Sequence, residues 1–230
     1  MRKEPRSRLP VIATGIAAAL LCNFWVLEGL LAKRNDLSGA WISDLAARSQ
    51  VYGWRFQLLE VAAGLAIAAL AVLLRRQSGD GSPLLRRGLL ALLVAGLLAA
   101  IGGAAPLNCA EALERACDLS YDPFDLVHTG ANLLEAVALA VAFALIGADL
   151  LGLDSVRRLS PRGIQATNAP GVALGRATLA IGALWLLLMA ASGLAYLVGD
   201  LESAKGLFQR GAQLLLGAWL ALLAICSPSP

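Results

Sequence analysis

The chain has 230 residues, of which 58% are hydrophobic and only 15% are charged. Soluble domains carry about 25% charged residues, so this composition, with a mean hydropathy of +0.70, excludes an ordinary soluble domain and predicts a membrane protein. The net charge of +3 comes from arginines spread over short loops, which indicates a topology signal rather than a nucleic-acid-binding surface.

Six apolar runs are long enough to cross ~30 Å of hydrocarbon as helices, which takes about 20 residues each. They span residues 10–31, 53–74, 84–104, 127–151, 173–198 and 205–226. The segments between them are too short for a soluble domain. We therefore expect one transmembrane domain over residues 1–230, an all-α bundle of six helices.

Basic residues gather before the first helix and in the loops that follow the second and fourth helices. They are Arg2, Lys3, Arg6, Arg8, Arg75, Arg76, Arg86, Arg87, Arg157, Arg158, Arg162 and Arg176, which make up 12 of the 19 basic residues. If six helices alternate in direction, all of these residues lie on one side, and the positive-inside rule makes that side the cytoplasm. Both termini are therefore expected in the cytoplasm.

Two of the four cysteines fall in the loop between the third and fourth helices, on the expected outer side. Cys109 and Cys117 are eight positions apart, and an oxidising compartment favours a bond between them. We predict this disulfide. Cys22 and Cys226 fall within the first and last helices, where small buried apolar residues are expected.

The fourth helix carries a polar stripe that contains the only histidine of the chain. Asp125, His128, Asn132 and Glu135 are spaced so that they share one face of a helix. At ~1.5 Å rise per residue, Glu135 lies about 15 Å below Asp125, near the centre of the bilayer. A carboxylate at that depth costs roughly 2.5–3.5 kcal/mol, so it must face a wet cavity, pair with a cation or be protonated.

Polar residues of the other helices fall at matching depths. Together with the stripe they predict an outward-facing acidic pocket, closed by two arginines. Its expected residues are Glu28, Ser43, Asp44, Arg55, Glu60, Asn132, Glu135, Arg210 and Gln213. The alternative is a network of interhelical ion pairs and hydrogen bonds that only holds the bundle together.

Asp125 and His128, one helical turn apart, are candidate catalytic residues because a carboxylate can orient and charge an imidazole for acid–base chemistry. No nucleophile motif accompanies them. A metal site has weak support, since His128 is the sole nitrogen ligand and the remaining carboxylates suit calcium or magnesium better than zinc. We expect no cofactor and no metal.

Two stretches resemble a known family. They are "WISDLAARSQVYGWRFQLLEVAAGL", residues 41–65, and "DPFDLVHTGANLLEA", residues 122–136. Both are similar to an uncharacterised bacterial membrane family catalogued as domain of unknown function 998, which resembles six-helix eukaryotic proteins of the Frag1/DRAM/Sfk1 type in layout. The resemblance implies Ser43, Asp44, Asp125 and His128 as positions typical of the family. It implies no established activity, although the eukaryotic proteins are associated with lipid remodelling and membrane regulation.

These observations lead to three hypotheses for a multi-pass protein of the bacterial plasma membrane. The first is binding or handling of a polar or cationic group, such as a lipid headgroup, from the outer leaflet. The second is an intramembrane lipid hydrolase or transferase that uses Asp125 and His128. The third is a small transporter subunit or structural protein. The expected partners are membrane lipids and, in the third case, another membrane protein, with no nucleic acid.

Overall fold

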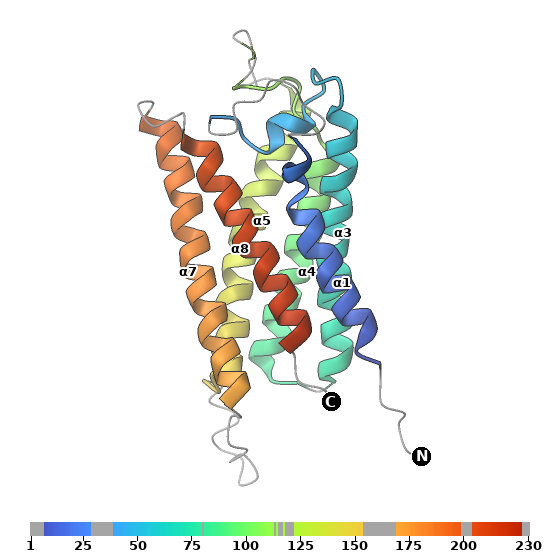
Figure 1. Cartoon of the computed structure of the whole chain (residues 1–230), viewed down its shortest axis with the longest axis vertical. Helices are drawn as coiled ribbons and strands as arrows, with labels where there is room; N and C mark the ends of the chain where they lie inside the picture. Colours follow the sequence, from blue (N-terminus) through green and yellow to red (C-terminus); the bar gives the residue numbers. More distant parts are fainter. Residues whose placement is uncertain are drawn as a thin grey trace.

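The computed structural model describes residues 7–28, 39–79, 81–112, 114, 117, 122–153, 169–198 and 204–226. Over these residues the protein is helical, without strands (Figure 1). Its α-helices are α1 (Leu9–Cys22), α3 (Gly53–Ser78), α4 (Pro83–Ala104), α5 (Pro123–Leu150), α7 (Ala169–Val198) and α8 (Lys205–Cys226). Two short 3₁₀-helices, η1 (Phe24–Leu27) and η2 (Ser43–Ala46), complete the described elements. The expected all-α class is confirmed.

Five of these helices, α3, α4, α5, α7 and α8, are long and apolar enough to cross a membrane. The chain is therefore a multi-pass membrane protein. Helix α1 is apolar but has only 14 residues, so the expectation of a continuous helix over residues 10–31 is wrong.

Asn23 explains the early end of α1. Its Nδ2 donates to the Ala19 carbonyl at 2.9 Å, and its backbone N–H bonds to Leu20 three residues back at 3.1 Å. This tighter hydrogen bonding leads into η1, and residues 29–31 lie outside the described part of the chain.

The start of α5 also differs from the expected residue 127. The Asp122 side chain accepts from the Phe124 N–H at 2.8 Å, and Pro123 suits the first helical position.

The six helices form a closed ring. Each helix packs against its neighbours in sequence, and α1 packs against α8 to complete the circle. Inside it, the aromatic ring of Phe143 lies 4.2 Å from that of Trp219 and 5.9 Å from that of Trp185. The core thus lies inside the ring, whereas the outer faces of the helices expose large apolar side chains, as a hydrocarbon environment requires.

Both described ends of the chain lie at the same end of the bundle, because the Arg8 Nη2 donates to the Ile225 carbonyl at 2.7 Å (Figure 1). Helix α3 ends here, and α4 and α7 begin here, so the arginines at these helix ends gather at this end of the bundle. We call it the basic end. Its described arginines are Arg8, Arg75, Arg76, Arg86, Arg87 and Arg176; Arg2, Lys3, Arg6, Arg157, Arg158 and Arg162 lie outside the described residues. Cys226 is exposed at this end, contrary to expectation, because it is the last residue of α8, whereas Cys22 is buried as expected.

Glycines let α3 and α4 approach closely. A Cβ on Gly96 would lie 2.5 Å from the Ala68 nitrogen and 2.6 Å from the Gly64 oxygen, and a Cβ on Gly64 would meet the Gly96 oxygen at 2.6 Å. Backbone contacts of this kind replace the hydrophobic driving force that lipid does not provide between helices.

We predict that Gly96→Ala destabilises the protein by about 1–3 kcal/mol, because the new methyl group forces two backbones apart. Gly193 in α7 is the matched control, since a Cβ there meets nothing within 4 Å and alanine favours helix by up to about 1 kcal/mol. Thermal unfolding in detergent should separate the two variants. Equal behaviour would contradict the close approach of α3 and α4.

Candidate functional site

A cavity of about 110 Å³ lies inside the helical ring and is large enough for several water molecules. We call it the central cavity. All six α-helices and both 3₁₀-helices contribute to its wall. The lining residues are Cys22, Phe24, Ile42, Ser43, Glu60, Ala63, Ile67, Ala99, Asn132, Glu135, Ala136, Leu139, Trp185, Met189, Gln209, Gln213 and Leu216.

The polar part of this wall is acidic. Glu60 of α3 and Glu135 of α5 bring two carboxyl groups to the cavity, and the remaining polar groups are neutral: Ser43, Asn132, Gln209 and Gln213. None of the residues that line it is basic. The structure therefore collects five residues of the expected pocket, Ser43, Glu60, Asn132, Glu135 and Gln213, around one space.

Sequence reasoning missed Gln209. Its Oε1 accepts from the Ile42 N–H at 2.7 Å, which ties α8 to the segment that enters η2. The spacing of the two glutamines could have indicated it, because Gln209 precedes Gln213 by four positions and therefore lies on the same helix face.

His128 lies next to the cavity wall rather than in it. Its Nδ1 is 2.9 Å from the Gly102 oxygen, and its Nε2 is 2.8 Å from the Asn132 Nδ2. A carbonyl can only accept, so Nδ1 carries the proton and Nε2 accepts from Asn132. A Cβ on residue 102 would lie 2.9 Å from the Asn132 Oδ1, so glycine allows α4 to approach this pair. His128 thereby fixes the orientation of Asn132.

Asp125 does not bond to His128; its hydrogen-bond partner is the backbone of Asn108. Its Oδ1 accepts from the Asn108 N–H at 2.8 Å, and both nitrogens of the imidazole are already engaged. The interpretation of Asp125 and His128 as an acid–base pair therefore has no geometric support.

Within the described residues, no three His, Cys, Asp or Glu side chains come together in a way that could hold a metal ion.

Two expected pocket residues form a buried ion pair instead. The Arg210 Nη2 lies 2.8 Å from the Glu28 Oε2, and the Arg210 Nη1 donates to the Ala40 carbonyl at 2.7 Å. Both side chains are buried and neither lines the cavity. Arg210 thus joins α8 to the end of η1, and breaking such a pair by removing one partner costs several kcal/mol.

Arg55, the other arginine expected to close the pocket, lies on the outer surface. Its guanidinium stacks on the rings of Tyr52 and Trp54 at 4.9 Å and 5.3 Å. Arg55 therefore does not close the cavity, because the aromatic residues next to it hold its guanidinium on the outside of the bundle.

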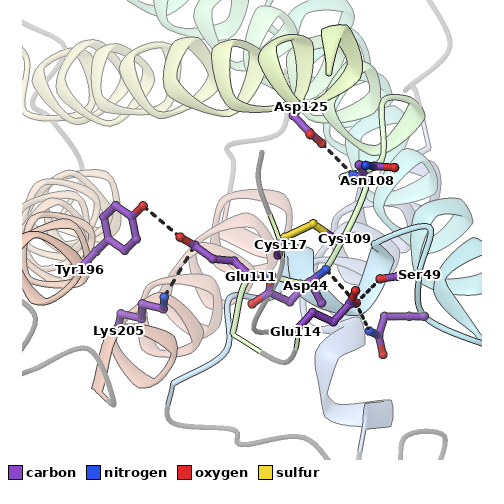
Figure 2. Close-up of a disulfide and its surroundings, with 12 residues drawn as sticks. Asp44, Ser49, Asn108, Cys109, Glu111, Glu114, Cys117, Asp125, Tyr196 and Lys205 are labelled. Atoms are coloured by element: carbon purple, nitrogen blue, oxygen red, sulfur yellow. Dashed lines mark hydrogen bonds and ion pairs between the residues drawn. A yellow bond between two sulfur atoms is a disulfide. The ribbon is translucent and has the colours of Figure 1, made fainter. Parts of the chain in front are cut away.

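The end of the bundle opposite the basic end carries the expected disulfide between Cys109 and Cys117. We call it the cystine end, and residues 109–117 the cystine loop. Figure 2 shows the Glu111 carboxylate between α7 and α8: the Tyr196 hydroxyl donates to it at 3.0 Å, and the Lys205 Nζ lies 3.8 Å away. Glu114 accepts from Ser49 and, at 3.3 Å, from the Gln50 amide. The described part of the loop is thus anchored to α7, α8 and the segment before α3.

We call the cystine loop together with η2 the cap; Asp44 of η2 is completely buried within it. It accepts from the Trp41 N–H at 2.9 Å and from the Glu111 N–H at 3.2 Å. Burial raises the pKa of the Asp44 carboxyl to about 6, although the Trp41 hydrogen bond and the charge of Lys205 oppose this rise. Asp44 therefore holds the cap together and does not line the cavity.

We predict that Asp44 makes stability depend on pH. Because its folded pKa of about 6 exceeds the ordinary value of 3.8, the stabilisation from proton uptake is complete below pH 3.8 and is lost as the pH rises through about 6. The gap corresponds to about 3 kcal/mol. Thermal midpoints in detergent at pH 4 to 7 should show wild type losing stability relative to Asp44→Asn over this range. A pH-independent difference would contradict the assignment.

Comparison with curated proteins and with solved structures gave no match. The family model described as Protein of unknown function (DUF998) matches residues 15–226. The match runs from the middle of α1 to the end of α8 and includes the cavity, the cap and both sequence stretches discussed above. The chain therefore belongs to the DUF998 family, as its two motifs indicated.

Proposed function

We propose that the protein binds a polar, cationic group in its central cavity, and that lipid headgroups of the outer leaflet of a bacterial plasma membrane present this group. The observation that carries the proposal is that Glu60 and Glu135 both line a cavity whose wall holds no basic residue. Nearby cations are already engaged, since Arg210 pairs with Glu28 and Lys205 with Glu111.

The energetics of the membrane interior favour a cationic occupant. A charged carboxylate at this depth is costly unless a cation or water compensates it. A bound cation would remove that cost, whereas an anion would add to it. The amides of Asn132, Gln209 and Gln213 supply neutral hydrogen-bonding groups that can orient the occupant.

The direction of access follows from the two ends of the bundle. We place the basic end in the cytoplasm because arginines cluster there, and the cystine end outside because disulfides persist in oxidising compartments. Six crossings follow if α1 and η1 together span the membrane. The cavity wall includes η1 and η2 at the cystine end, which favours entry from the outer leaflet.

This topology predicts that Cys226, an exposed thiol at the basic end, reacts with a membrane-permeant maleimide in intact cells but not with an impermeant one. Val51 is 83% exposed at the cystine end, so a Val51→Cys variant should react with both reagents. Labelling of Cys226 from outside would overturn the proposed orientation.

The binding proposal predicts that soluble cationic headgroup analogues raise the thermal midpoint of the purified protein, whereas glycerol phosphate and glycerol do not. The expected stabilisation is roughly 2.7 kcal/mol at about 100 times Kd. Glu135→Gln should abolish the effect while the protein still folds.

Asp149→Asn is the matched control for this experiment. Asp149 is a buried carboxyl of the same helix, but it bonds to Ser82 at the basic end and does not line the cavity. Its analogue response should equal that of wild type. The proposal would be wrong if glycerol phosphate stabilised the protein, or if no cationic analogue stabilised it.

A further inference from the structure

We infer that the occupant of the central cavity is a protonated primary amine with a hydrogen-bond acceptor oxygen on a neighbouring carbon, the chemistry of an aminoethanol headgroup. This inference rests on the proposed function and narrows its ligand class. Aminoethanol can arrive free or linked to a lipid, and the amine chemistry is the same in both cases.

A protonated amine can donate hydrogen bonds to several groups of the cavity wall at once. The cavity wall offers several acceptors, because Glu60 and Glu135 each carry two carboxyl oxygens and the Gln213 amide carries one, whereas the Gln209 Oε1 already accepts from the Ile42 N–H at 2.7 Å. The Glu60 Oε2 is buried without a hydrogen-bond partner among the described residues. An –NH₃⁺ group offers three donors together with its charge. It can therefore satisfy both carboxyl groups and one amide oxygen at once.

A quaternary ammonium group fits this wall less well. It has no N–H donor, so it would leave the buried carboxyl oxygens without hydrogen bonds, which is unfavourable for each of these groups. Quaternary ammonium sites are instead built as aromatic cages. Here the aromatic lining consists of Phe24 and Trp185, and these rings pack against Phe56 and Phe143 respectively.

A bare metal ion is also disfavoured. Calcium takes 6–8 oxygen ligands and magnesium demands octahedral geometry. The cavity wall offers two carboxyl side chains, and the described residues contain no cluster of three that could hold a metal.

Trp185 indicates what lies beside the amine. Its side chain is only 2% exposed and lines the cavity, and its Nε1 has no acceptor among the described residues. Buried indole N–H groups usually find a partner. An oxygen next to the amine supplies an acceptor for this donor, and a group of a few heavy atoms matches a space of about 110 Å³.

The test compares amine classes on the full-length wild-type protein in nanodiscs. Thermal shift with free ethanolamine and free choline measures the soluble source. Native mass spectrometry of protein ejected from nanodiscs with equal phosphatidylethanolamine and phosphatidylcholine measures the lipid source. We expect at least tenfold preference for ethanolamine chemistry in at least one arm, and the arm that responds identifies the source. Equal or stronger binding of choline chemistry would overturn this inference while leaving the proposed cation site intact, and binding of neither class would overturn both.

Variants then locate the site. Glu60→Gln and Trp185→Phe should each reduce ethanolamine binding at least fivefold, and Asp149→Asn should leave it unchanged. Trp185→Phe keeps an aromatic ring but removes the N–H, so its loss should appear with ethanolamine and not with ethylamine, which lacks the oxygen. An equal loss with both amines would contradict the assigned role of the oxygen. The wild-type comparison stands even if a variant fails to fold.

Discussion

Hydrocarbon offers no partner to a charged side chain, so every charge in the interior of this bundle must be compensated by the protein or by something that it binds. Two ion pairs provide such compensation within the protein; Arg210, Glu28 and Lys205 are buried, whereas Glu111 is partly exposed. Arg210 lies against Glu28 at 2.8 Å, and Lys205 lies 3.8 Å from Glu111. Glu60 and Glu135 differ because they share a cavity without a basic neighbour in its wall. The binding proposal follows from that difference.

The ring of helices explains why a cavity exists at this position. Close approach at Gly64 and Gly96 sets the α3–α4 seam, and Gly15 meets Ala224 where α1 closes the ring against α8. Six helices arranged in a circle leave a central space that side chains must fill. Large rings, such as Trp219 and Phe143, fill it over part of its length. Toward the cystine end, smaller polar groups leave the central cavity open.

The sequence was sufficient to predict features that depend on local spacing. The apolar runs located the long helices, and the helical periodicity of Asn132 and Glu135 placed both on the cavity wall. Features that depend on which side chains meet across the ring were not predictable. Arg55 and Arg210 look equivalent in sequence, yet Arg55 stacks on Tyr52 outside the bundle while Arg210 turns inward to Glu28. The break after Cys22 depends on a side-chain bond from Asn23 that competes with helix continuation.

The cystine loop and the cavity are mechanically linked through η2. Ser43 lines the cavity, and the next residue, Asp44, accepts a hydrogen bond from the Glu111 backbone within the cystine loop. Glu111 in turn contacts Tyr196 of α7 and Lys205 of α8. A displacement of the loop would therefore act on η2 and on two helices of the cavity wall at once. Because the disulfide closes the loop into a short segment, it limits such displacement and thereby helps to hold η2, and with it Ser43, in place.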